Sequence, residues 1–292
     1  MRYACIDRRR NSYPVRMMCR LCEVSRSGYY AWRSRPQSRR AKADQELLDK
    51  IKSIHADNRG VYGSPRIHAE LVENGCQVGR HKVAKLMHLQ GLKGCPVRRF
   101  VVTTKRDLSH GVADNLLNQD FSAKAPNERW VADITYIDTH QGWLYLAVVM
   151  DLYSRRIVGW SMSQWMSRHV VIDALRMAIN ARQPEGNLVH HSDRGVQYTS
   201  DDFRDELDRH GIECSMSGTG NCFDNAAAES FFGLLKRECI KGVKYLTRDE
   251  ARADVFDYIE CFYNPKRRHG YVGNISPVEF EKRTTGLNQT VH

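Results

Sequence analysis

The 292-residue sequence has no apolar stretch long enough to cross a bilayer. Its longest apolar run, Trp143 to Met150, is far shorter than the roughly 20 residues that a transmembrane helix needs. The basic N-terminus is not followed by an apolar segment, so a secretory signal is not indicated. We therefore expect a cytoplasmic protein with no membrane partner.

The sequence also lacks the cysteine pattern of a disulfide scaffold and the repeat of a coiled coil. Its nine cysteines are odd in number and scattered, which favours reduced thiols in a bacterial-type interior. Cys19 and Cys22 have no matching second pair, so a zinc site is not expected there. No heptad pattern is sustained along the chain.

Acidic residues are scarce in the first third of the chain. Residues 1–43 contain 12 lysines and arginines against two acidic residues, and residues 44–110 contain 12 against seven. From 111 to 240 the balance reverses to 12 basic and 18 acidic residues, although the whole chain has a net charge of +11. A basic arm joined to an acidic centre suits a protein that holds phosphates with one part and cations with another. The alternative is a basic surface that serves only solubility.

The first basic segment, residues 1–43, is predicted to contain a helix-turn-helix. Apolar spacing and capping residues from Tyr13 to Arg33 indicate two short helices joined by a tight turn. The candidates for DNA contacts in its second helix are Arg26, Tyr29, Tyr30 and Arg33. The alternative is a small helical hairpin whose aromatic side chains form a core.

A second helix-turn-helix is predicted in residues 44–95. Ser64 and Pro65 begin one helix, Gly75 ends it, and a basic helix follows from residue 80 to 89. The candidates for DNA contacts on the basic helix are Arg80, Lys82 and Lys85. A solvated helix face would show the same pattern. Residues 96–125 have little periodicity and are predicted to be a linker.

From residue 126 the pattern changes to strands and helices. Three runs rich in β-branched and aromatic residues, at 130–137, 143–150 and 156–162, predict an antiparallel meander. Two short strands follow, interleaved with helices, and a further helix carries Glu229. This order predicts an α/β fold, a ribonuclease-H-like core with a mixed five-stranded sheet, over residues 126–240. Residues 241–292 are predicted to add a C-terminal helix and a basic tail.

Three carboxylates are expected to meet in this fold. Asp133 lies inside the apolar run WVADITYI, where aspartate is rare unless it has a role. Asp193 follows the strand ending in two histidines, and Glu229 lies one turn into its helix, with 35 residues between the two. Hard carboxylate oxygens suit Mg²⁺ or Mn²⁺, and two such ions can serve an in-line displacement at phosphorus. We therefore predict a two-metal site on these three residues.

Other interpretations of these acids stay open from the residues alone. Asp138 and Asp151 are rival carboxylates, although turn chemistry at strand ends accounts for both. Glu229 by itself would be interpreted as a solvated helix glutamate. On its helix, one side would carry Glu229, Phe232, Gly233 and Lys236, and the helix would pack through the opposite side.

Four motifs, WVADITYI, HHSDRGVQYTS, FDNAAAESFFGLLKRE and YNPKRRHGYVGNISPVEFE, together resemble a known family. The chain looks like the second reading frame of insertion-sequence family three, within the superfamily of DDE transposases and retroviral integrases. The resemblance covers essentially the whole chain. It implies Asp133, Asp193 and Glu229 as catalytic metal ligands and Lys236 as a contact to transposon-end DNA.

The resemblance implies a DNA transposase that cleaves a 3′ end of its element and transfers the strand, using Mg²⁺ with Mn²⁺ as a substitute. Its partners would be DNA, at the terminal inverted repeats and at the target, and further copies of the chain in a synaptic complex at the nucleoid. The family also implies fusion or association with an upstream-frame protein that has a helix-turn-helix and a leucine zipper.

Three residues near the C-terminus, Arg267, Arg268 and His269, are predicted to touch DNA phosphate, with a structural ion-pair role as the alternative. Two rival functions also remain at this stage. A structure-selective nuclease of the same fold would share the three carboxylates. A non-catalytic DNA-binding modulator of transposition would use only the basic first third.

Overall fold

The computed structural model describes residues 2–36, 38–95, 113, 115–116, 122–217 and 225–289. The chain divides into two compact units, Met1–Ser53 and Ile54–His292. The predicted boundary after residue 43 differs from this division, because it falls inside the single continuous helix α4 (Arg39–Asp57). Nearly all of the linker predicted at 96–125 lies outside the described residues.

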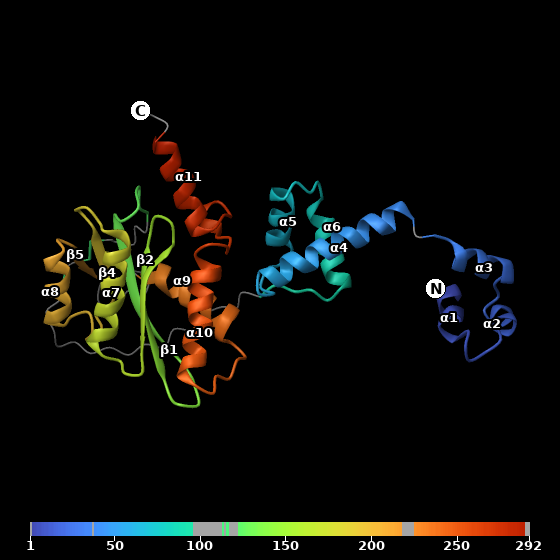
Figure 1. Ribbon diagram of the computed structural model, residues 1–292, viewed down its shortest axis with the longest axis horizontal. Helices are drawn as coiled ribbons and strands as arrows, with labels where there is room; N and C mark the ends of the chain where they lie inside the picture. The colour runs from blue at the N-terminus through green and yellow to red at the C-terminus, as the bar shows by residue number, and fades with distance from the viewer. Residues whose placement is uncertain are drawn as a thin grey trace. The chain divides into compact units, whose positions relative to one another are not determined.

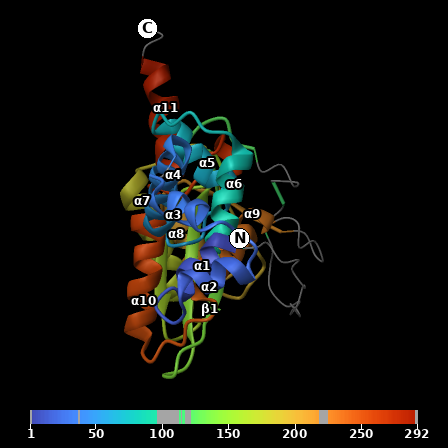
Figure 2. The ribbon, with the colours of Figure 1, turned by 90° about the vertical axis from the view of Figure 1, so that its right-hand side faces the viewer.

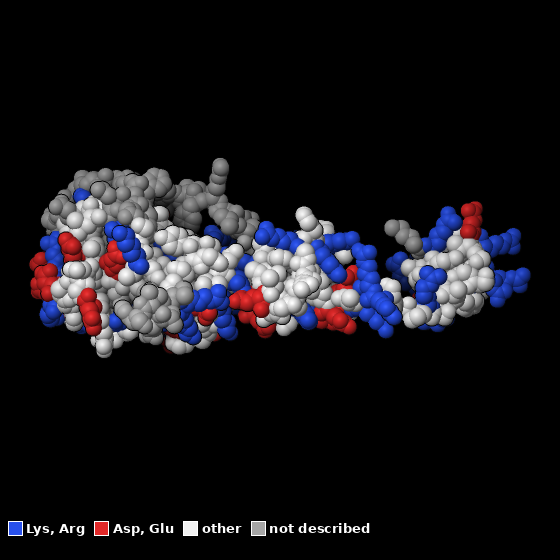
Figure 3. Space-filling model, turned by 90° about the horizontal axis from the view of Figure 1, so that it is seen from above, with Lys and Arg blue, Asp and Glu red and all other residues white. Residues whose placement is uncertain are grey.

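The N-terminal unit begins with three short helices, α1 (Arg2–Arg9), α2 (Val15–Leu21) and α3 (Arg26–Ser34). α2 and α3 match the predicted helix-turn-helix, whereas α1 was not predicted. α1 completes a small core, in which Ile6 packs with Met18, Cys19 and Tyr29. In Figure 3, the visible face of this unit carries many more lysine and arginine side chains than acidic ones.

Helices α5 (Ser64–Glu73) and α6 (Arg80–Leu89) form the second predicted helical pair. Pro65 stands in the first turn of α5, and Gly75 follows the helix in the left-handed conformation that glycine favours. This pair belongs to the same unit as the sheet. Arg59, just before α5, forms an ion pair with Asp254 on helix α10 (Arg248–Phe256), which ties the pair to the C-terminal helices.

The second unit contains the predicted mixed five-stranded sheet. Its strands are β1 (Arg129–Ile137), β2 (Leu144–Asp151), β3 (Ile157–Ser163), β4 (Val189–Ser192) and β5 (Glu213–Met216). Their order across the sheet is β3-β2-β1-β4-β5. β1 to β3 form the antiparallel meander, and β1, β4 and β5 are parallel. The observed bounds lie within one or two residues of the predicted ones.

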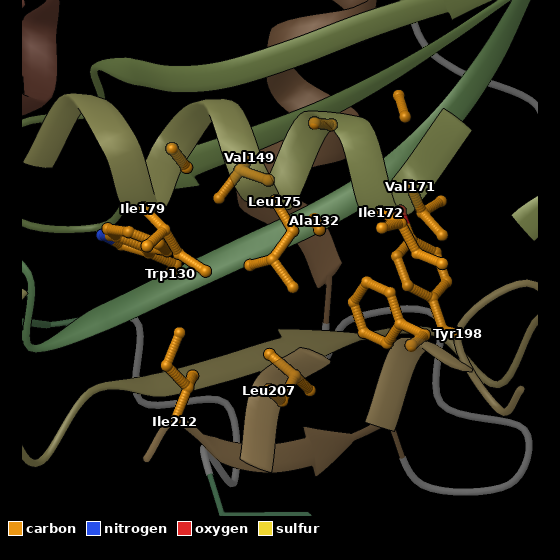
Figure 4. Close-up of a cluster of buried hydrophobic side chains, with 14 of the residues drawn as sticks. Trp130, Ala132, Val149, Val171, Ile172, Leu175, Ile179, Tyr198, Leu207 and Ile212 are labelled. Atoms are coloured by element: carbon orange, nitrogen blue, oxygen red, sulfur yellow. The ribbon is translucent and has the colours of Figure 1, made fainter. Parts of the chain in front are cut away.

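Helices cover both faces of this sheet (Figure 1). Trp130 and Ala132 of β1 pack with Leu175 and Ile179 of α7 (Arg168–Arg182), as Figure 4 shows. Helix α8 (Asp201–Arg209) adds Phe203 and Leu207 to the same core. Because side chains alternate along a strand, the intervening residues of β1, including Asp133, point to the opposite face. Helix α9 (Ala226–Leu235) contacts β1 there.

The C-terminal part of the chain continues from α9 through the π-helical turn η2 (Lys236–Ile240) to α10. A second π-helical segment, η3 (Asp257–Tyr263), extends α10, and together they span the predicted helix. A short 3-10 turn, η4 (Gly270–Val272), leads to α11 (Pro277–Gln289). Figure 2 shows α10 and α11 in red along this unit. No helix among the described residues combines the length and apolar character needed to cross a membrane.

Candidate active site

The pairing of two parallel strands brings Asp133 and Asp193 together. Val131 of β1 pairs with His191 of β4, and Asp133 and Asp193 each follow two residues later, close enough for their charges to interact. The carboxyl ends of parallel strands form a crevice at which ligands gather in α/β sheets. Two aspartates that are 60 positions apart in the sequence therefore share one end of the sheet.

Backbone amides hold both aspartate side chains. The N–H of Ile134 donates to Asp133 Oδ1 at 2.8 Å, and the N–H of Gly195 donates to Asp193 Oδ1 at 3.0 Å. Burial and the nearby carboxylate of Asp193 raise the pKa of Asp133 to about 8. Two acids are thus kept side by side although their negative charges repel each other.

Glu229 lies in the first turn of α9, which packs against β1. Its side chain is largely exposed, and the burial that it does have raises its pKa. The charge of Glu229 also contributes to the raised pKa of Asp133, as expected for a third acid facing the same site. Lys236 opposes this effect, because its ammonium group favours the ionised form of Asp133.

The predicted division of α9 into an open and a packed side is wrong. Phe232 and Gly233 were assigned to the side of Glu229, yet both are buried, together with Ala228, Phe231 and Leu235. The helix is apolar over most of its circumference and is enclosed on several sides. Glu229 remains exposed, and Lys236 is partly buried at the start of η2.

The three acids offer the donor set of a hard divalent cation. Among the described residues, no three acidic, histidine or cysteine side chains already stand close enough together to enclose a metal ion. Asp133 and Asp193 nevertheless form a carboxylate pair whose repulsion a cation would relieve. These residues therefore fit Mg²⁺ or Mn²⁺, with Glu229 as the outer member of the set.

Two further residues belong to the site and were missed in the sequence. The Asn225 side-chain amide donates to the carbonyl oxygen of Ala132 at 3.1 Å, which fixes the start of α9 beside Asp133. Tyr198 is buried, and burial together with the charges of Asp133 and Asp193 raises the pKa of its hydroxyl. The signal for both was their place within the quoted motifs, but residue type alone assigns them no role.

The two rival acids lie in different surroundings. Asp151 is fully buried, forms an ion pair with Arg182, and accepts hydrogen bonds from the backbone of Asn127 and Tyr153. It therefore stabilises the turn between β2 and β3 and the packing of α7. Asp138 is exposed just beyond the end of β1.

The structure separates the predicted DNA contacts of the N-terminal unit into exposed and buried residues. Arg26, Tyr30 and Arg33 are exposed on α3, and Arg33 lies 3.6 Å from Asp7. Tyr29 is instead fully buried, and its hydroxyl donates to Asp7 at 2.9 Å. Tyr29 therefore has a core role in place of the predicted DNA contact. On α6, the candidates Arg80, Lys82 and Lys85 are all exposed.

The arginines of the C-terminal motif have structural partners in place of the predicted phosphate. Arg267 is buried, and its guanidinium makes two hydrogen bonds of 2.6 Å to the carboxylate of Glu238. Arg268 forms ion pairs with Glu70 and Glu73 of α5. His269 is largely buried, and burial lowers its pKa to about 4. The structural alternative therefore applies to Arg267 and Arg268, because their charges are satisfied within the protein.

Comparison with protein families gives three matches along the chain. Residues 123–222 and 229–285 each match a model of an integrase core domain. Residues 42–100 match an HTH-like domain. The two integrase-core segments contain Asp133, Asp193 and Glu229, and the HTH-like segment contains α5 and α6.

Curated relatives match almost the full chain. The transposase InsF for insertion sequence IS3A of Escherichia coli (strain K12) is 42% identical over 285 residues, which cover 97% of this chain and 99% of that protein. An uncharacterized 31 kDa protein of insertion element IS600 from Shigella sonnei is 44% identical over 266 residues, covering 91% of this chain and 98% of the relative.

Solved structures give more distant matches. The catalytic core domain of HTLV-2 integrase, in its trimeric form in complex with magnesium, aligns with 17% identity and a TM-score of 0.42, covering 55% of this chain and 99% of that one. A simian T-cell lymphotropic virus intasome in complex with a PP2A regulatory subunit aligns with 15% identity and a TM-score of 0.43, covering 79% and 74% of the two chains.

Proposed function

The chain belongs to the IS3 family of DNA transposases, DDE-type enzymes with an integrase core, and we propose that it carries out both DNA strand cleavage and strand transfer at Asp133, Asp193 and Glu229. The substrate of the first step is a phosphodiester at the end of the element. The substrate of the second step is a phosphodiester in another DNA segment.

One observation carries this proposal. Asp133 and Asp193 follow the last paired residues of two neighbouring parallel strands, and the charges of Asp193 and of Glu229 on α9 both act on Asp133. Burial and Asp193 raise the pKa of Asp133 to about 8, and a bound cation would favour its ionised form. Bound Mg²⁺ or Mn²⁺ would supply stabilisation of the negative charge on the attacking and leaving oxygens.

The chemistry consists of two displacements at phosphorus. In the first, a water oxygen bonds to the scissile phosphorus while the bond to the 3′ oxygen of the element breaks, which leaves a free 3′-hydroxyl. In the second, that 3′ oxygen attacks another phosphodiester and displaces a 3′ oxygen there, so the number of phosphodiester bonds is unchanged. The protein forms no covalent bond to DNA in either step.

The chain's own residues have positioning roles in these steps. Ile134 N–H and Gly195 N–H fix the rotation of the two aspartate side chains. Lys236 stands next to Asp133, where its ammonium group can hold a non-bridging phosphate oxygen of the bound end. The exposed cations of α3 and α6 are proposed to bind the same DNA outside the active site, within a multimer that holds two ends.

The test is a reaction of the full chain with inverted-repeat DNA in Mg²⁺ or Mn²⁺, resolved on a denaturing gel. We expect a shortened strand from cleavage and a longer strand from joining. Glu229→Gln should abolish both products while DNA binding is retained. Cleavage without joining, under conditions that supply target DNA, would indicate a nuclease and contradict the proposal.

Asp138→Asn provides the matched control. Asp138 also follows β1 and is exposed, whereas the main influences on the pKa of Asp133 are burial, Asp193, the Ile134 N–H, Glu229 and Lys236. Its replacement should leave both products unchanged. Equal losses in Asp138→Asn and Glu229→Gln would contradict the assignment of the three acids.

A further inference from the structure

Two exposed aromatic side chains lie at the end of the β1–β2 hairpin. Tyr136, on β1, is 56% exposed, and Trp143, just before β2, is 48% exposed. Their ring centroids are 4.9 Å apart in an edge-to-face arrangement. Two exposed rings that pack on each other offer flat apolar faces to a ligand, and the neighbours of this pair distinguish it from the other exposed aromatic side chains of the chain.

This pair is connected to the active site through Lys236. The Nζ atom of Lys236 lies 5.3 Å from the centroid of the Tyr136 ring. The positive charge of the same ammonium group lowers the pKa of Asp133. Tyr136 is three residues beyond Asp133, about 10 Å along β1, and its side chain starts from the opposite face of the strand, so Lys236 is the side chain that lies near both. At about 3.4 Å per nucleotide of a stacked strand, this distance corresponds to about three nucleotides.

The surroundings of the pair suit a polyanion. The hairpin end is bonded to the segment that follows η2, because the N–H of His140 donates to the carbonyl of Tyr245 at 3.0 Å. That segment carries Lys241 and Lys244, both exposed. On the other side, Arg248 donates through Nε to the carbonyl oxygen of Trp143 at 3.1 Å. In the turn of the hairpin, residues 138–142, the acidic residue is Asp138.

We propose that Tyr136 and Trp143 form a stacking platform for an unpaired base of the element end, within about three nucleotides of the scissile phosphate. This inference rests on the proposed function and adds positioning residues to it. Exposed aromatic rings beside cations are the means by which proteins hold single-stranded nucleic acid, because every base has a face that stacks. Stacking here would hold the melted strand end so that its phosphate stays at the acids.

The test uses the full chain and end DNA with 2-aminopurine at each of the first three positions from the scissile bond. Stacking quenches the fluorescence of this base, so the wild-type complex should be dim at one of these positions. Tyr136→Ala and Trp143→Ala should restore the fluorescence. They should also lower the single-turnover cleavage rate at subsaturating DNA by about 5- to 150-fold, the effect of losing one base–aromatic stack. Tyr136→Phe keeps an aromatic ring and should therefore retain most of the quenching seen with the wild type.

Phe256→Ala is the matched control. Phe256 is 50% exposed and forms another edge-to-face pair, with Trp160, at a centroid distance of 6.0 Å. Its replacement should change neither fluorescence nor rate. Quenching that persists in both alanine variants, or an equal loss in Phe256→Ala, would overturn the platform. Thermal unfolding of each variant should match the wild type, since Tyr136 and Trp143 are largely exposed.

The two proposals fail in different ways. If the wild-type chain yields no cleaved strand with any inverted repeat, the proposed function is wrong. If the wild-type chain cleaves and the alanine variants cleave equally well with the same quench, only the platform is wrong.

Discussion

Removing one partner of the buried ion pair of Arg267 and Glu238 is expected to destabilise the second unit strongly. The two side chains are 1% and 3% exposed and share two hydrogen bonds of 2.6 Å. The hydroxyl of Tyr258 donates to the same carboxylate at 2.9 Å. Glu238 belongs to η2, directly after α9, so this pair also anchors the helix that carries Glu229.

Arg267→Met would leave the Glu238 carboxylate buried without its counter-ion. Breaking a buried pair in this way costs about 3–5 kcal/mol. In a unit of this size each kcal/mol lowers Tm by about 2–4 °C, so we expect a fall of about 6–20 °C. Replacing both residues by methionine removes the unpaired charge and should recover most of the loss. Thermal unfolding without DNA, followed by circular dichroism, measures these changes.

Arg283→Ala is the control, because this arginine is half exposed and pairs with Glu279 at the surface. It should give no resolvable change in Tm. A wild-type Tm for Arg267→Met, together with weaker binding to end DNA and a salt dependence reduced by about one phosphate contact, would refute the structural role of this pair. That result would restore the phosphate role inferred from the sequence.

Three other predictions concern pH, packing and metal. Burial and the neighbouring His191 lower the pKa of His190 to about 3. Below pH ~6.5 the unfolded chain takes up a proton that the folded protein does not, so the free energy of unfolding should fall by about 1.4 kcal/mol per pH unit between 6.5 and 3. His190→Phe should flatten this dependence in urea unfolding measured across that pH range. Gly159→Ala would place a Cβ against the Ala174 carbonyl oxygen and should destabilise by about 1–3 kcal/mol in urea unfolding, whereas Gly270→Ala, with open space around it, should not. Mn²⁺ at a hundredfold excess over its Kd should stabilise the wild type by about 2.7 kcal/mol in thermal unfolding. The absence of this stabilisation in Asp193→Asn would place the cation at Asp193.

Periodicity predicted the catalytic fold well, because local patterns largely determine its elements. The β-branched runs predicted at 130–137, 143–150 and 156–162 appear in the structure as β1 to β3, within one residue of their expected ends. The parallel pairing of β1 with β4 was also expected from the sequence, since a helical crossover between two strands favours a parallel pair.

The parts that were missed depend on contacts between distant residues. Nothing near Arg267 or Arg268 indicates their acidic partners, which are 29 and almost 200 positions away. Tyr29 was assigned to DNA because α1 was not expected, and α1 supplies both Ile6 and the acceptor Asp7 that enclose it. Phe232 and Gly233 were placed on an open face because helix geometry alone does not reveal how many neighbours enclose α9.

The most direct test of the central claim is single-turnover strand transfer by variants of the three acids, each with its DNA binding measured in parallel. We expect Asp133→Asn, Asp193→Asn and Glu229→Gln each to bind end DNA as the wild type does and to form neither cleaved nor joined strands. Joined product from any one of them, at a rate comparable with the wild type, would contradict the claim that these carboxylates act as one site.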